Sequence, residues 1–182
     1  AAPIELSRIL IKFDYGKINS LTGSTLDISS NNFKCELVLK DIMGGQATPT
    51  NFNLVLNPLS QSFDEGKGRD ISSFADLDRA NFITASYSDG TNYPWNTEGA
   101  NAKGYLGSEN IDVITSGNLG AGDVDLGVSQ VFTLGSEDLK MDITKHVSAS
   151  LKGDLPNHGF RIAFSGSEET DTKTRFVKRF AS

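Results

Sequence analysis

The stretch from residue 139 to residue 165, LKMDITKHVSASLKGDLPNHGFRIAFS, constrains the fold more than any other part of this chain. It carries Ile143, Val147 and Leu151 at intervals of four residues, which predicts a short helix with one apolar face. A turn-forming segment with Asp, Pro, Asn and Gly follows, and a strand pattern completes the stretch. A lone helix that crosses between two strands often closes one end of a two-sheet sandwich.

The ends of this helix and the strand after it are also marked in the sequence. Asp142 precedes the apolar stripe, where a carboxylate can accept from free backbone N–H groups. Gly153 follows the stripe, where a left-handed residue ends a helix at little cost. Residues 160–164, FRIAF, then place aromatic and aliphatic side chains at every second position. That alternation predicts a strand with one buried face.

The rest of the chain supplies short strands joined by long polar loops. We predict strands at residues 7–15, 33–42, 52–59, 110–115, 128–134 and 172–182, and loops at 19–32, 86–107 and 165–171. Residues 71–77 are a candidate for a second short helix. The predicted fold is all-β, an antiparallel, jelly-roll-like β-sandwich with one or two short helices and long loops. We expect residues 1–182 to form one such domain, as a fragment of a longer chain.

Charge and hydropathy exclude two classes of partner. The formal net charge is −6, and an acidic surface repels phosphate backbones, so we expect no nucleic-acid binding. The basic residues near the end, Lys173, Arg175, Lys178 and Arg179, alternate with apolar ones and are expected on the solvent face of a strand. No apolar run approaches the roughly 18 residues of a membrane-spanning helix, so we expect no membrane partner.

The sequence offers adjacent carboxylates but no convincing acid–base pair. Asp64 and Glu65 form one such pair, and Glu168 and Glu169 form another. Neighbouring residues on a strand point to opposite faces, and both pairs fall in predicted loops. A catalytic pair needs two carboxyl groups held on either side of a substrate, so we interpret these four as solvated side chains.

Nucleophilic chemistry and zinc binding are also poorly supported. His146 and His158 are the two histidines of the chain, and both are expected at the surface. Cys35, the one cysteine, shares its strand parity with apolar neighbours and is expected to be a buried thiol. We therefore predict that the protein is not an enzyme. The alternative of a polysaccharide lyase or hydrolase would depend on Glu65.

One aromatic cluster is a candidate glycan platform. Trp95, the only tryptophan, lies in a loop-rich region with Tyr87, Tyr93 and Tyr105. Aromatic rings on an exposed face or loop are what sugar-binding modules use. The structural alternative, which we favour, is that Trp95 anchors a long loop to the core.

A second candidate is a calcium site, although no other cofactor is expected. Asp123 and Asp125 lie in a glycine-rich loop, and Glu168, Glu169 and Asp171 lie in another. Carboxylate oxygens at loop bases suit Ca²⁺, but no EF-hand spacing is present. Solvated loop carboxylates are the favoured interpretation.

Several segments resemble, in the same order, the motifs of DNRLRE-type domains. These segments are SRILIKFD (residues 7–14), CELVLKDI (35–42), FNLVLNPL (52–59), QSFDEGKGRD (61–70), YPWNTEGA (93–100), LKMDITKHVSASLKG (139–153) and NHGFRIAFS (157–165). The chain departs from the family pattern at Phe63, where Trp is usual, and at FVKRFAS (176–182), which lacks an Arg-Glu pair. The resemblance implies a jelly roll like that of carbohydrate-binding modules. The chain looks most like virion proteins of tailed bacteriophages.

This resemblance implies a noncatalytic role. Our leading expectation is a structural or decorating module in the head, neck or tail of a phage virion, in contact with other virion proteins or with copies of itself. An unpaired sheet edge beside residues 176–180 would favour such contacts. The alternative is a carbohydrate-binding or adhesion module of an extracellular, cell-surface or virion-surface protein.

Overall fold

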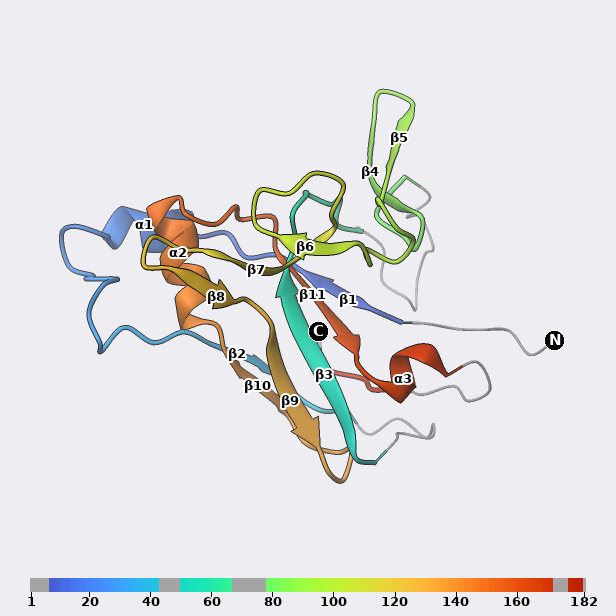
Figure 1. The fold of residues 1–182 in the computed structure, drawn as a ribbon. Helices are drawn as coiled ribbons and strands as arrows, with labels where there is room; N and C mark the ends of the chain where they lie inside the picture. The colour runs from blue at the N-terminus through green and yellow to red at the C-terminus, as the bar shows by residue number, and fades with distance from the viewer. Residues whose placement is uncertain (1–6, 43–49, 67–77, 172–176, 182) are drawn as a thin grey trace.

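The structure, a computed structural model, describes residues 7–42, 50–66, 78–171 and 177–181. Figure 1 shows packed β-sheets whose strands are joined by long loops. The predicted fold class, an antiparallel β-sandwich with short helices and long loops, is therefore confirmed. The helices in this part of the chain are too short to cross a membrane.

Four of the described strands form the first sheet, in the order β1–β11–β3–β9. They are β1 (Ile9–Ile11), β11 (Phe160–Phe164), β3 (Phe52–Pro58) and β9 (Val128–Phe132), each antiparallel to its neighbours. The inner face carries large apolar side chains, and the rings of Phe52 and Phe132 stack there with centroids 4.8 Å apart. The outer face carries Asn57 and Arg161, which are also buried.

The second layer consists of two paired strands and a helix. β2 (Glu36–Leu39) pairs antiparallel with β10 (Leu139–Asp142), and α2 (Thr144–Lys152) follows β10 almost directly. The main core lies between the layers and includes Leu37, Leu54, Leu56, Leu139, Met141, Ile143, Val147, Phe160 and Ile162. Burial of these apolar side chains is the main favourable term in folding.

Both predicted ends of α2 are confirmed. Asp142 Oδ1 accepts from the backbone N–H of Thr144, the first helical residue, at 2.8 Å. Hydrogen bonds from Thr144 to Asp142 lower the pKa of that carboxyl group. Gly153 follows the helix with φ of 86°, and its N–H donates to Ser150 O at 3.2 Å. A residue with a Cβ would be strained at this position.

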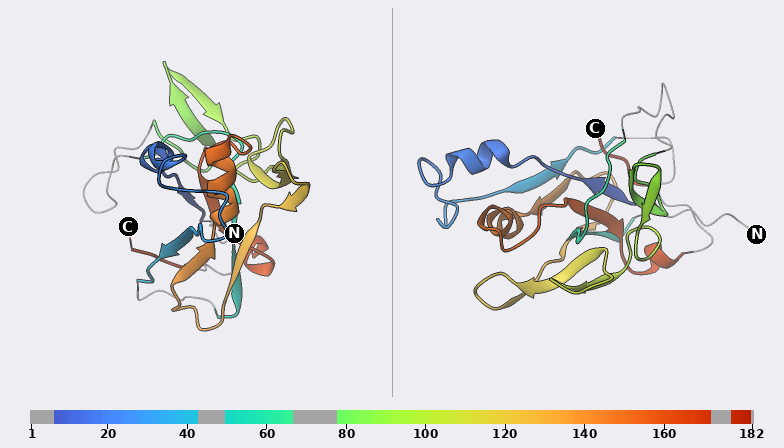
Figure 2. Two further views of the ribbon diagram at one scale, coloured as in Figure 1. Left: turned by 90° about the vertical axis from the view of Figure 1, so that its left-hand side faces the viewer. Right: turned by 90° about the horizontal axis from the view of Figure 1, so that it is seen from above.

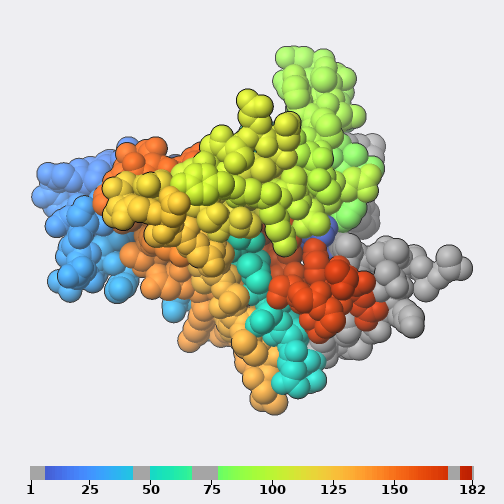
Figure 3. Space-filling view, viewed as in Figure 1, coloured from blue at the N-terminus to red at the C-terminus, as the bar shows by residue number. Residues whose placement is uncertain are grey.

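A second group of strands lies partly within the predicted loop, residues 86–107, and partly outside it, and includes the strand predicted at residues 110–115. They are β4 (Thr84–Ser88), β5 (Thr91–Pro94), β6 (Lys103–Tyr105), β7 (Val113–Asn118) and β8 (Asp123–Asp125). β4 and β5 form a hairpin that stands out from the body of the molecule (Figures 1 and 3). β6 pairs parallel with β7, the one parallel pair among the described strands. The alternation rule missed β5 because all four of its residues are exposed.

The end of the chain extends the second sheet. Phe180 bridges Asp41 antiparallel, and the N–H of Ala181 donates to Lys40 O at 2.8 Å. Of the predicted final strand, residues 172–176 and 182 lie outside the described residues. The side chain of Lys178 is buried rather than solvent-facing: its Nζ contacts the Asp41 carboxylate and donates to Gly135 O and Glu137 O, both at 2.9 Å. The predicted solvent-facing position of Lys178 is therefore wrong.

Two further short helices occur where loops were predicted. α1 (Gly16–Leu21) lies at the end of the sandwich near α2, and α3 (Ser167–Thr170) follows β11 (Figures 1 and 2). The helix predicted at residues 71–77 lies outside the described residues. Cys35 is half-buried and forms no disulfide.

His146 is fully buried, so its predicted place at the surface is wrong. It lies on α2 beside the apolar stripe, and its ring packs edge-on against Phe160 with centroids 5.8 Å apart. Nε2 donates to Leu126 O at 2.9 Å. Burial lowers the pKa of His146 and also that of the half-buried His158.

These depressed pKa values predict a loss of stability in mild acid. In the unfolded chain each histidine takes up a proton near pH 6.5, whereas the folded protein resists protonation until lower pH. Stability should therefore be constant above about pH 6.5 and fall below it, by at most about 1.4 kcal/mol per pH unit for each histidine. Urea unfolding between about pH 7.5 and 5.5 measures this slope. His146→Gln should flatten it, and an unchanged slope would contradict the assignment.

Candidate functional site

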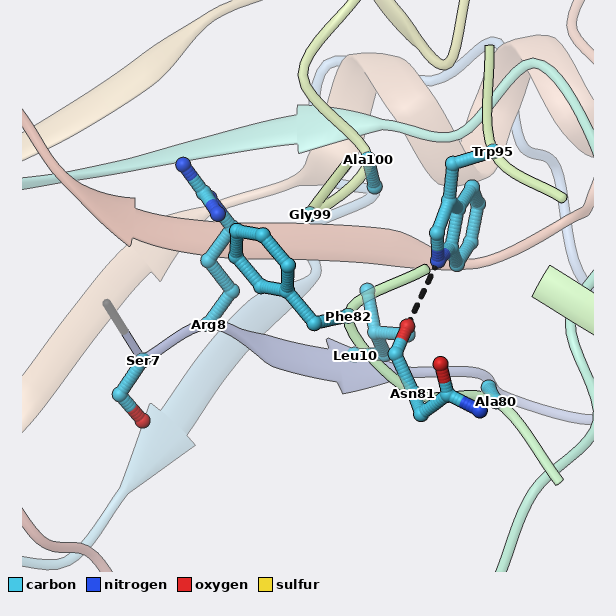
Figure 4. Close-up of a pocket in the computed structure, with 9 residues that line it drawn as sticks. All are labelled: Ser7, Arg8, Leu10, Ala80, Asn81, Phe82, Trp95, Gly99 and Ala100. Carbon is cyan, nitrogen blue, oxygen red and sulfur yellow. Dashed lines mark hydrogen bonds between the residues drawn. The ribbon is translucent and has the colours of Figure 1, made fainter. Parts of the chain in front are cut away.

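Trp95 lies directly after β5 and fixes the base of the hairpin. Its side chain is buried, and its indole Nε1–H donates to Asn81 O at 2.9 Å (Figure 4). Its backbone N–H donates to Ile83 O at 3.0 Å. The ring packs in a small apolar cluster that includes Leu59, Ala85, Ala100 and Val113. Trp95 is therefore a core anchor and does not present its ring as an exposed platform.

Asp112, a fully buried carboxylate, holds the loop that follows Trp95. Its Oδ1 accepts from the N–H of Asn96 at 2.7 Å and from Gln61 Nε2 at 2.9 Å. Its Oδ2 accepts from the N–H groups of Thr97 and Ala102, both at 2.9 Å. These donors satisfy a carboxylate that would otherwise be costly to bury. Residues 96–102 are thus tied to the start of β7.

Two buried arginines share one carboxylate beside this loop. The side chains of Arg8 and Arg161 are 7% and 4% exposed. Arg8 Nη2 contacts Glu169 Oε1 on α3, and Arg161 Nη2 lies 3.9 Å from the same oxygen. Arg161 Nη1 also donates to Ala100 O at 2.9 Å. β1, β11, α3 and the 96–102 loop therefore meet at one charged cluster.

Several guanidinium N–H groups of this cluster have no hydrogen-bond acceptor in the described part of the chain. Among the described residues, Nε and Nη1 of Arg8 and Nε of Arg161 are buried and have no acceptor. Burial, followed by the charge of Arg8, lowers the pKa of Arg161 to about 10. Desolvation disfavours a cation, and a second cation nearby adds to that cost. The carboxylates of Glu169 and Asp112 act in the opposite direction and raise the pKa of Arg161.

A cavity of about 250 Å³ opens between Arg8 and Trp95. The Phe82 ring lies against the Arg8 side chain, 5.4 Å from the guanidinium carbon to the ring centroid, and Trp95 forms the opposite wall (Figure 4). Gly99, with φ of 75°, allows this approach because a Cβ there would overlap both Arg8 and Phe82. The cavity combines aromatic walls with a buried guanidinium. Such a lining suits recognition of a small polar or acidic group.

The structure does not bring the four predicted aromatic residues onto one surface. Tyr87 and Tyr93 lie on the two strands of the hairpin, and Tyr93 is exposed. Tyr105 lies in β6, in a different sheet, and its hydroxyl donates to Asp123 Oδ1 at 2.6 Å. That hydrogen bond raises the pKa of Tyr105. The exposed hairpin tyrosine is the member of the set best placed to contact a ligand.

Asp123 and Asp125 lie in β8, and both are exposed. Asp123 accepts from Tyr105, and Asp125 Oδ1 accepts from the N–H of Gly127 at 2.8 Å. In the described part of the chain, no three His, Cys, Asp or Glu residues gather closely enough to hold a metal ion. Glu169, from the other predicted calcium loop, pairs with Arg8 instead.

Sequence reasoning missed Asp112, Arg8 and Arg161. Asp112 lies between the apolar residues Ile111 and Val113. A single acidic residue within an apolar segment is the sequence signal that could have identified it as a buried carboxylate. Arg161 occupies the non-apolar position of FRIAF, which alternation assigns to the solvent side. Its burial depends on loops that cover the outer face, and no local pattern encodes them.

Comparisons with protein-family models, with curated proteins and with solved structures found no match to this chain. The resemblance to DNRLRE-type domains therefore stays a prediction from sequence motifs.

The Asp112 carboxylate should be essential for this region. We expect Asp112→Asn to lower the free energy of unfolding by about 2–3 kcal/mol, because an amide cannot accept from donors on both sides. Urea unfolding followed by fluorescence of Trp95, the only tryptophan, measures this loss. Asp123→Asn is the matched control on an exposed strand and should cost less than about 0.5 kcal/mol. Equal losses in the two variants would refute the role of Asp112.

Proposed function

We propose that this chain is a noncatalytic structural or decorating module of a bacteriophage virion that works through protein–protein contacts. The virion context rests on the sequence resemblance. The contact role rests on the β4–β5 hairpin and on the cavity at its base. The partners are other virion proteins or further copies of this chain.

The observation that carries the proposal is the exposure of strand β5 on both of its faces. Successive residues of a strand point to opposite sides, and all four residues of β5 are exposed. Within the described residues, β5 pairs with β4 alone. An isolated two-stranded hairpin is marginally stable in water. A partner that covers one face, or adds a strand to the β5 edge, would stabilise it.

Apolar side chains around the hairpin base supply further contact area. Phe82, Ile83 and Tyr93 are 43%, 58% and 50% exposed. Aromatic and aliphatic anchors beside a pocket are typical of the energetic centre of an interface.

Sedimentation of the isolated chain over a range of concentrations tests the contact role. We expect a defined oligomer that the double substitution Ile83→Ser and Tyr93→Ser dissociates, because it removes two exposed anchors without touching the core. Val131→Ser, at a position of β9 that is 65% exposed, is the control and should leave the oligomer intact. A monomer at every concentration would count against self-association and favour the alternative below.

The alternative is a carbohydrate-binding or adhesion module at a virion or cell surface, and exposed Tyr93 is the observation that favours it. A glycan screen should then show binding that Tyr93→Ala abolishes and Val131→Ala preserves. Trp95→Ala is unsuitable here because Trp95 is a core anchor. Absence of glycan binding would remove this alternative.

A further inference from the structure

The pairing of the chain end with the second sheet brings Lys178 to Asp41. Phe180 lies opposite Asp41, and the N–H of Ile42 donates to Arg179 O at 3.2 Å. Lys178 precedes Phe180 by two residues, the spacing that places two side chains of an extended segment on one face. A long side chain at such a diagonal position reaches its cross-strand neighbour. This register explains why Nζ of Lys178 contacts the Asp41 carboxylate.

The contact between these two side chains is shielded from water. The side chain of Lys178 is 2% exposed, and that of Asp41 is 15% exposed. The rings of Phe132 and Phe180 lie beside the amine, with centroids 5.2 and 5.0 Å from Nζ. Two ions in apolar surroundings lose more hydration than a neutral amine and a carboxylic acid do. The surroundings therefore favour products without charge.

Backbone groups fix the orientation of both partners. Nζ of Lys178 donates to Gly135 O and to Glu137 O, both at 2.9 Å. The third N–H of the ammonium is directed at the Asp41 carboxylate. When that proton moves to the carboxylate, the lone pair left on Nζ faces the carboxyl group. The N–H of Asp41 donates to Asp138 Oδ1 at 2.9 Å, so the segment that carries the carboxyl group is held as well.

We propose that Lys178 and Asp41 condense to form an intramolecular amide bond. The ammonium gives one proton to the carboxylate, and the lone pair of Nζ attacks Cγ of the resulting carboxylic acid. One C–O bond breaks, and its oxygen leaves as water with two of the three protons that Nζ carried. One ion pair thus yields one amide and one water, without an oxidant or a second reactant.

Fixed geometry and exclusion of water are what this step requires. Two groups held in contact react far faster than the same groups free in solution. A lysine amine removed from water is a nucleophile in many proteins. The product would attach residues 177–181 covalently to the segment that follows β2. This reaction is independent of the proposed function.

Mass spectrometry of the denatured full chain tests for the bond. After prolonged incubation of the folded protein, we expect a mass below the sequence mass by that of one water molecule. Digestion with trypsin should release a branched peptide that joins residues 41–67 to residues 176–179, because an acylated Lys178 is not cleaved. An unchanged mass would overturn the proposal, and so would loss of water without this branched peptide.

Lys178→Arg keeps the positive charge but replaces the amine with a guanidinium, so this variant should retain its full sequence mass. Lys40→Arg is the matched control. Nζ of Lys40 lies 2.7 Å from Asp138 Oδ2 in an ion pair, but the lysine side chain is exposed. This control should lose water as the parent does. Loss of water that persists in Lys178→Arg would come from another part of the chain and would refute the assignment. The branched peptide of the parent decides the question even if Lys178→Arg folds poorly.

Discussion

The strand pair β3–β11 is buried on both faces, and the rest of the structure depends on this arrangement. On the inner face, Leu56 and Ile162 pack against the second sheet and α2. On the outer face, Asn57 and Arg161 are removed from water as well. Polar groups that lose water must find partners within the protein. The outer face therefore needs a further layer, which the 96–102 loop and α3 provide.

Ion pairs and charge-assisted hydrogen bonds hold that outer layer in place. Asp112 gathers N–H donors from the loop and from Gln61, while Glu169 pairs with Arg8 and lies near Arg161. Buried charges cost several kcal/mol each unless they are paired and hydrogen-bonded, so the loop has little freedom to move. Gly99 completes the arrangement, since the absence of a side chain leaves room for Arg8 and Phe82. The cavity beside Trp95 follows from this packing.

The two ends of the sandwich offer different surfaces. The hairpin end presents the exposed strand β5, aromatic side chains and a small cavity lined by Arg8. The α1 end presents a larger, mostly apolar cavity beside the exposed carboxylates of Asp14 and Glu36. The β-sheets lie between these two ends and support both of them.

The sequence by itself determined the sandwich core and the ends of α2. Alternation in FRIAF and FNLVL, and the four-residue spacing of Ile143, Val147 and Leu151, are local patterns whose apolar side chains must share one face. Only the tertiary structure decided that His146 and Arg161 are buried and that β5 is a strand. Their surroundings come from segments distant in sequence, so a side chain's local pattern cannot reveal whether another layer will cover it.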